Sequence, residues 1–103
     1  MLTGKQRAQL RSLAATEETI LQIGKGGITA NVVAQLNSAL EARELVKGRV
    51  LENALLTPRA ACDELAEACG AEPVQVIGSR FVLYRRSRKE PRIELVQAGG
   101  KKR

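Results

Sequence analysis

The residues best suited to bind an anion form a glycine-rich cluster with a lysine, Gly24-Lys25-Gly26-Gly27, and Thr29 follows closely. Glycines lack a Cβ, so their backbone can approach a phosphate closely and can adopt positive φ. Thr29 is a good cap for a helix, and a helix start adds free N–H groups and about half a positive charge. Lys25 adds a point charge at the tip. The segment Gly24–Thr29 therefore predicts a clamp for a sugar–phosphate backbone.

The loop alone is a weak signal, because short G-x-x-G matches are common and many are plain tight turns. The pattern G-x-x-x-x-G-K-[S/T] of nucleoside triphosphate loops is absent. The dinucleotide pattern G-x-G-x-x-G is not completed after Gly27, and Glu44, about 20 positions on, does not rescue it. The loop thus predicts backbone contact without nucleotide binding.

Basic side chains outside the loop are further candidates for phosphate contact: Lys5, Lys47, Arg49, Arg80, Arg85 and Arg86. Each has an alternative reading as ordinary solvated surface, since exposed lysine and arginine are common on any soluble protein. The net charge of +6 adds weight to the last three. Residues 1–79 hold eight basic and nine acidic residues, whereas residues 80–103 hold nine basic and two acidic ones. Concentrated positive charge is typical of proteins with a polyanionic partner, although a solubilising tail is also possible.

Other chemistries are poorly supported. The chain has no histidine, and no carboxylate pair lies near the glycine loop, so we expect no enzyme and no cofactor. Cys62 and Cys69 lie seven residues apart on a predicted helix, which separates them by ~10 Å, too far for a disulfide. Two thiols without further ligands do not predict a zinc site. With no signal-peptide hydrophobic region, we expect a cytoplasmic protein.

Hydrophobic periodicity and cap residues predict seven elements. Thr3 and Gln6 form a capping box for the first helix, Thr57 and Pro58 start the third, and Gly70 ends it. The elements are a helix over Lys5–Ala15, a strand over Thr19–Ile23, a helix over Ala30–Arg43, a strand over Leu45–Leu51, a helix over Pro58–Cys69, and strands over Pro73–Ile77 and Phe81–Arg85. We expect one domain over residues 1–86 and a basic, flexible tail over 87–103.

The strand over Leu45–Leu51 alternates most clearly, with Val46 and Val50 on one face and Lys47 and Arg49 on the other. A strand with one polar face belongs to a sheet that is covered on one side. Strand–helix–strand links predict parallel neighbours, and the short turn at Gly78-Ser79 predicts an antiparallel hairpin. The expected architecture is an α/β two-layer αβαβαββ sandwich, a four-stranded mixed sheet with its helices packed on one face.

Four segments together resemble the YhbY/CRM family, the chloroplast RNA splicing and ribosome maturation domain. They are Leu2–Arg7, Ile23–Thr29, Leu45–Lys47, and Val74–Gly78 followed by Val82–Arg85. The resemblance implies a fold similar to the C-terminal domain of the third bacterial translation initiation factor. It also implies binding of structured RNA, notably ribosomal RNA in large-subunit precursors, with the family's G-x-x-G loop at Gly24–Gly27. Members often have histidine at the position of Ala15 and leucine at that of Ile28.

The partner is therefore expected to be RNA, bound by a monomer, with no membrane and no small-molecule substrate. Phe81 and Tyr84 are the only aromatic residues, and at opposite parity one of them, Phe81, is expected in the core. Reading unpaired bases by stacking needs several aromatics on one surface, so binding should follow shape and charge. A protein-binding adaptor and a structural ribosome-associated protein are the alternatives. Steep salt dependence would favour RNA over the adaptor.

Overall fold

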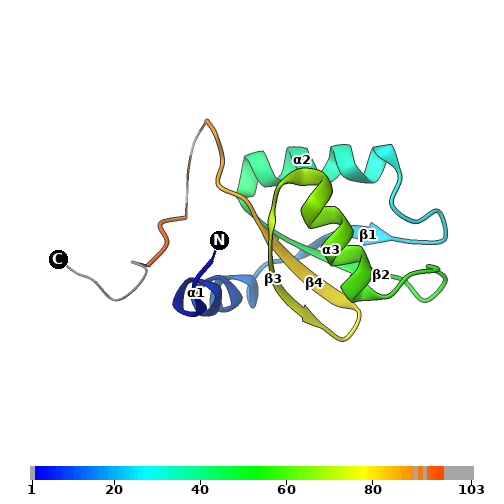
Figure 1. Cartoon of the computed structure of the whole chain (residues 1–103), viewed down its shortest axis with the longest axis horizontal. Helices are drawn as coiled ribbons and strands as arrows, with labels where there is room; N and C mark the ends of the chain where they lie inside the picture. Colours follow the sequence, from blue (N-terminus) through cyan, green and yellow to red (C-terminus); the bar gives the residue numbers. More distant parts are fainter. Residues whose placement is uncertain (1, 90, 92, 97–103) are drawn as a thin grey trace.

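The computed structural model describes residues 2–89, 91 and 93–96 of the chain. Its elements follow the order predicted from the sequence, with small shifts at their ends (Figure 1). They are α1 (Gly4–Ala14), β1 (Thr19–Ile23), α2 (Ala30–Arg43), β2 (Leu45–Val50), α3 (Pro58–Cys69), β3 (Glu72–Ile77) and β4 (Arg80–Tyr84). None of the helices in the described part of the chain has the length and apolar character that a membrane crossing requires.

The predicted threonine caps start all three helices. The Thr3 hydroxyl accepts a hydrogen bond from the Gln6 backbone, and the Gln6 side chain accepts one from the Thr3 backbone, which completes the capping box. Thr29 and Thr57 cap α2 and α3 in the same way. Gly70 ends α3 at φ 64°, a conformation that favours glycine. Local chemistry therefore sets the starts of all three helices and the end of α3.

The four strands form one mixed sheet in the order β1-β2-β4-β3. β1 and β2 are parallel, while β4 runs antiparallel to both β2 and β3. The prediction of parallel neighbours is confirmed for β1 and β2, and the predicted hairpin is confirmed as well. The prediction of parallel neighbours is wrong for β2 and β3, which are not neighbours in the sheet. The hairpin places β4 between β2 and β3, so α3 crosses over to an edge strand.

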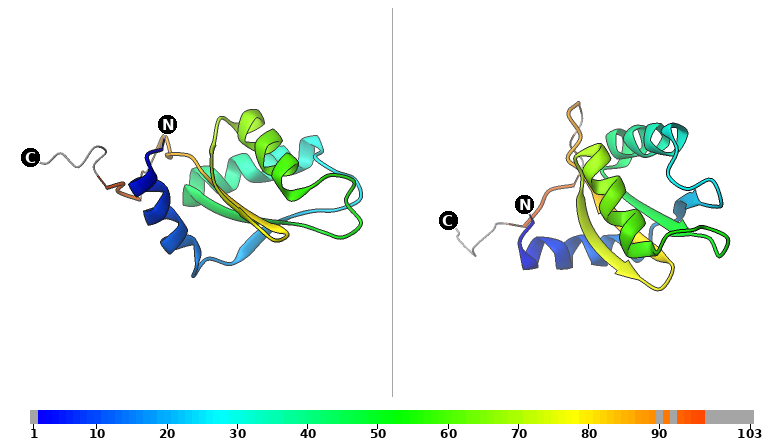
Figure 2. Two further views of the ribbon diagram at one scale, coloured as in Figure 1. Left: turned by 60° about the horizontal axis from the view of Figure 1, so that its bottom comes forward. Right: turned by 45° about the vertical axis from the view of Figure 1, so that its right-hand side comes forward.

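The prediction that all helices pack on one face is wrong for α1. α2 and α3 cover one face, where Leu36, Leu40 and Leu65 pack around Phe81. α1 covers part of the opposite face, as both views in Figure 2 show. There its residues Leu10 and Ala14 pack on Leu45, Val74, Val82 and Tyr84. Strand β4 is therefore apolar on both sides, and both aromatics of the chain are buried: Phe81 is 0% exposed and Tyr84 5%.

The tail expected to be flexible has ordered contacts in the part that the structure describes. The buried carboxylate of Glu44 accepts hydrogen bonds from the backbone N–H groups of Ser87 and Ile93, each at 2.7 Å. Ile93 and Leu95 pack on the core under α1, and Gln9 exchanges hydrogen bonds with the backbone of Glu94 and Val96. A segment of mixed polarity thus gains backbone partners from side chains elsewhere in the fold. The remaining tail positions, 90, 92 and 97–103, lie outside the described residues.

Candidate nucleic-acid interface

The glycine loop folds as a tight turn between β1 and α2. The N–H of Gly27 donates to the carbonyl of Gly24 at 3.0 Å, which leaves Lys25 and Gly26 exposed at the tip. Gly27 has φ 71°, whereas Gly24 and Gly26 lie outside the positive-φ region. Glycine is therefore needed for the backbone conformation only at Gly27. At Gly26 the space that a Cβ would fill is open, with the nearest atom, Cγ2 of Thr29, 3.9 Å away.

Three connections lie together at one edge of the sheet, which we call the loop edge: Gly24–Gly27, Glu52–Leu56 and Gly78–Ser79. The N–H of Leu51 donates to the carbonyl of Ile23, and the N–H of Val50 donates to that of Ser79, both at 2.8 Å. The loops before α2 and α3 therefore lie side by side, as Figures 1 and 2 show. Because β1 and β2 are parallel, α2 and α3 both begin at this edge. Neither has an acidic residue in its first turn to offset the positive helix end, and Glu52 is the acidic residue within the three connections.

Two arginines face each other on the sheet next to the loop edge. Arg49 of β2 is the register partner of Arg80 of β4, and Gln22 and Ile77 continue the same row on the outer strands. This row lies on the α1 face, because Gly48 and Phe81, the neighbours in the chain, face α2 and α3. Like charges directly opposite in a sheet are destabilising. Within the described residues neither arginine forms an ion pair, so the pair is open to an external anion.

Lys47 and Arg11 extend this positive surface towards α1. Together with Arg80 they line a shallow depression of about 200 Å³ between the end of α1 and the sheet. Arg11 was not among the residues predicted from the sequence, and its place in this surface follows from the packing of α1 on this face of the sheet. The alternation of β2 did correctly put Lys47 and Arg49 on one face. We call Arg11, Lys47, Arg49 and Arg80 the sheet cations.

Comparison with known proteins identifies the family of the chain. The model of the CRS1/YhbY (CRM) domain matches residues 2–85. The chain belongs to this CRM family. A CRM relative from Bacillus subtilis, "Probable RNA-binding protein YqeI", is 43% identical over 95 residues, which cover 92% of this chain and 99% of the relative. An "RNA-binding protein" from Haemophilus influenzae is 33% identical over 94 residues, 91% of this chain and 94% of its own length.

A solved structure supports the fold of this CRM domain directly. The solution structure of the hypothetical protein SAV1595 from Staphylococcus aureus superimposes with a TM-score of 0.78 at 49% sequence identity. The match covers 93% of this chain and all of the solved one. The three helices and the four-stranded mixed sheet are therefore shared by a protein of known structure.

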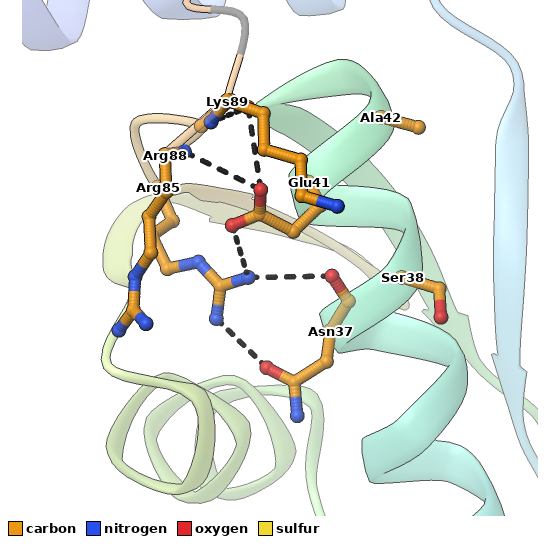
Figure 3. Close-up of a pocket in the computed structure, with 8 residues that line it drawn as sticks. Asn37, Ser38, Glu41, Ala42, Arg85, Arg88 and Lys89 are labelled. Atoms are coloured by element: carbon orange, nitrogen blue, oxygen red, sulfur yellow. Dashed lines mark hydrogen bonds and ion pairs between the residues drawn. The ribbon is translucent and has the colours of Figure 1, made fainter.

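Arg85 does not join the exposed cations of the CRM domain, contrary to the prediction. Its guanidinium turns towards α2, and its side chain is only 17% exposed (Figure 3). It donates to the side-chain and backbone oxygens of Asn37 at 2.7 and 3.3 Å, to the carbonyl of Cys69 at 2.8 Å and to Glu41 at 3.2 Å. Arg85 therefore ties β4 to α2 and to the end of α3. These oxygens surround the guanidinium, so its positive charge is balanced within the fold.

Lys5 and Arg86 also lie apart from the loop edge. Lys5 is in the first turn of α1, a helix that lies near the C-terminal segment of the described chain (Figure 1), and Arg86 follows the end of β4 that is away from the loop edge. Lys5 precedes Gln6, whose side chain donates to the carbonyl of Val96 at 3.0 Å. Arg86 lines a separate small depression with Pro91, Ile93 and Glu94. Apart from Arg85, the predicted basic residues thus divide into two groups: Lys25, Lys47, Arg49 and Arg80 lie at or next to the loop edge, while Lys5 and Arg86 do not.

The two cysteines of the CRM domain are buried and free, as expected from their spacing. Burial raises the pKa of the Cys62 thiol to about 11, and it raises the pKa of Cys69 as well. Protonated thiols are poor nucleophiles and poor metal ligands. Within the described residues, no group of three His, Cys, Asp or Glu side chains forms a metal site.

Proposed function

We propose that this chain is an RNA-binding protein that grips structured RNA by its sugar–phosphate backbone. The glycine loop approaches the RNA backbone, and Lys25 contacts a phosphate. The sheet cations contact further phosphates along the same RNA strand. The observation that carries the proposal is the Arg49–Arg80 pair, two opposed like charges without an ion pair in the described structure, directly beside the glycine loop. Relatives named as RNA-binding proteins over nearly their whole lengths support the same partner.

Backbone contact of this kind implies modest sequence selectivity. Phosphate and sugar contacts fix position without reading base identity. Both aromatic side chains are buried, so no aromatic surface is available for stacking on bases. The affinity should therefore fall log-linearly with salt, with a slope of roughly 0.9 per neutralised phosphate on duplex nucleic acid. An adaptor that binds proteins would show no such steep, uniform slope across unrelated RNAs.

The double variant Lys25→Asp with Gly26→Asp tests the clamp. Both changes put negative charge at the exposed tip, where the proposal places a phosphate. We expect affinity for a structured RNA, measured by fluorescence anisotropy, to fall at least about tenfold and the salt slope to fall by about one. Urea unfolding should be nearly unchanged, because neither side chain is part of the core.

A charge-matched control lies at the other end of the molecule. Gly4→Asp with Lys5→Asp makes the same change in net charge, and the space around Gly4 is open. An acid in the first turn of α1 is compatible with the helix. We expect this control to keep most of its affinity. Equal losses in both double variants would mean that net charge alone drives binding and that the loop has no special role.

For the cellular target, we propose ribosomal RNA in precursors of the large subunit, bound by a monomer during ribosome assembly. The support for this target is the resemblance to the CRM family, together with a surface that is suited to structured RNA. Crosslinking in cells, followed by sequencing of the bound RNA from sedimented free, precursor and mature fractions, tests it. Crosslinks confined to mature subunits would instead favour a permanent structural component, and crosslinks outside ribosomal RNA would refute the target.

A further inference from the structure

Leu55 is the most exposed large apolar side chain in the described chain, at 90%. It lies in the connection between β2 and α3, one of the three connections of the loop edge. Its two neighbours, Ala54 and Leu56, are packed against the core formed by α2, α3 and the sheet. The N–H of Ala54 also donates to the carbonyl of Leu51 at 3.1 Å. Leu55 is therefore held outward by anchored residues on both sides.

The position of Leu55 relates it to the glycine loop. The connection that carries it is hydrogen-bonded to the end of β1 through Leu51, and a Cβ added at Gly24 would lie 3.6 Å from Leu51 Cδ1 and 3.7 Å from Asn53 Oδ1. The two loops are thus joined by a hydrogen bond at their bases, and the side chains of Leu51 and Asn53 lie beside Gly24. Figure 2 shows the connection before α2 and the connection before α3 side by side at the same end of the sheet.

We infer that Leu55 is an apolar contact for an unpaired nucleotide next to the gripped backbone; this inference rests on the proposed RNA-binding function. Leu55 carries a full apolar surface that water disfavours, and it offers no charge or hydrogen bond to a phosphate. The faces of bases and the apolar edges of riboses are the parts of RNA that such a side chain can cover. With Phe81 and Tyr84 buried, an aliphatic side chain is what this edge can offer a base.

This contact selects a class of RNA. In a continuous A-form duplex the base faces are stacked on each other, and proteins reach mainly phosphates and 2′-hydroxyls. A base is available to Leu55 only where it has left the stack, at a bulge, an internal loop or the end of a helix. Aliphatic side chains are known to act as wedges at unstacked base steps. The loop edge is therefore suited to a duplex that is interrupted by unpaired nucleotides.

The experiment compares two RNAs and three proteins. The RNAs are a continuous hairpin duplex and the same duplex with a bulge of unpaired nucleotides. The proteins are the full chain, Leu55→Ser, and Ile20→Ser as the control for loss of a partly exposed aliphatic residue away from the loop edge. Ile20 is 39% exposed and lines a depression between β1 and α2. Urea unfolding of each protein establishes that it is folded, and affinities are measured across a salt series.

We expect the full chain to prefer the bulged RNA, and Leu55→Ser to lose about tenfold in affinity for it, which is about 1.4 kcal/mol. The affinity of Leu55→Ser for the continuous duplex and its salt slope should be unchanged, because no phosphate contact is lost. Ile20→Ser should bind both RNAs as the full chain does.

Other outcomes overturn the inference in distinguishable ways. If folded Leu55→Ser binds the bulged RNA as tightly as the full chain does, or weakens on both RNAs alike, Leu55 does not recognise unpaired nucleotides. RNA binding itself would still stand, and the exposed leucine would be left for a protein partner. If the full chain binds neither RNA in a salt-dependent manner, the proposed function fails and this inference fails with it.

Discussion

Three single alanine substitutions in the glycine loop would separate the glycine that the fold needs from those that a ligand needs. Gly27 lies at φ 71°, where a side chain is strained, while Gly24 and Gly26 lie outside this region. An added Cβ would meet only ordinary contacts at Gly24, 3.6 Å or longer, and almost open space at Gly26. The protein alone therefore tolerates alanine at Gly24 and Gly26.

The size of each effect on stability follows from the backbone. A left-handed conformation costs a non-glycine residue about 1–2 kcal/mol, whereas glycine-to-alanine at a compatible site stabilises by about 0.4–1 kcal/mol through the unfolded chain. We expect Gly27→Ala to lower the free energy of unfolding by about 1 kcal/mol. For a domain of this size that lowers Tm by roughly 4–8 °C. Gly24→Ala and Gly26→Ala should be neutral or slightly stabilising.

The effect on RNA should not follow the effect on stability. A methyl group at Gly26 occupies the space through which a phosphate would approach, so we expect Gly26→Ala to bind RNA about five- to tenfold more weakly although its fold is intact. Urea unfolding gives the stabilities, and fluorescence anisotropy well below Tm gives the affinities. If Gly26→Ala binds RNA like the wild type, close backbone approach is not the reason for the glycine. If Gly27→Ala is as stable as Gly26→Ala, the positive φ at position 27 does not require glycine.

Two further substitutions test the packing that positions the loop edge. Gly48→Ala should destabilise the protein by about 2–3 kcal/mol or more, because the new Cβ would lie 2.7 Å or less from two ring atoms of the buried Phe81. Gly4→Ala, where the space around the new Cβ is open, is the control. Equal unfolding midpoints for the two variants would refute the clash. Arg85→Ala should lower the free energy of unfolding by about 2–3 kcal/mol and leave the salt slope of RNA binding unchanged, since the two terminal nitrogens of Arg85 donate to groups inside the fold. A stable Arg85→Ala variant with a reduced salt slope would return Arg85 to the interface.

Local chemistry explains why the elements and the loop could be predicted. A threonine before each helix and a glycine after α3 act within a few residues of their own position, so the sequence pattern contains all of their determinants. The same holds for the turn at Gly24–Gly27. Alternation along β2 correctly placed Lys47 opposite Val46, because the side-chain period of a strand needs no knowledge of its neighbours.

The position of α1 could not be found in this way, because it depends on what lies on the second face of the sheet. The pattern of β2 shows a polar face at Lys47 and Arg49, and this face was extended to the whole sheet. β4 differs, since Val82 and Tyr84 make its second face apolar, and α1 packs there. The continuous apolar run of β4 was the signal for a strand covered on both sides.

Charge along the sequence proved a poor guide to charge on the surface. The basic excess lies in residues 80–103, yet within the described part Arg85 is bound to α2 and Arg86 lies by the C-terminal segment. Ion pairs also occupy Arg43 with Glu17 at 3.7 Å and Arg59 with Asp63 at 3.9 Å. The Arg59–Asp63 pair is an i,i+4 pair within α3, whereas the partners of Arg43 and Arg85 are brought to them by the fold, and sequence position does not contain that information.

The Arg49–Arg80 pair shows most clearly how charge on the surface differs from charge along the sequence. Opposed like charges in a sheet lower stability by roughly 0.2–1 kcal/mol, and threonine or glutamate at either position would remove the repulsion. Such a pair is stabilised when an anion lies over both guanidinium groups, since each then has an opposite charge within reach. The repulsion in the free protein and the attraction in the complex both favour occupation of the site. The repulsion between Arg49 and Arg80 therefore lowers the stability of the free protein, and its relief by a bound anion strengthens binding.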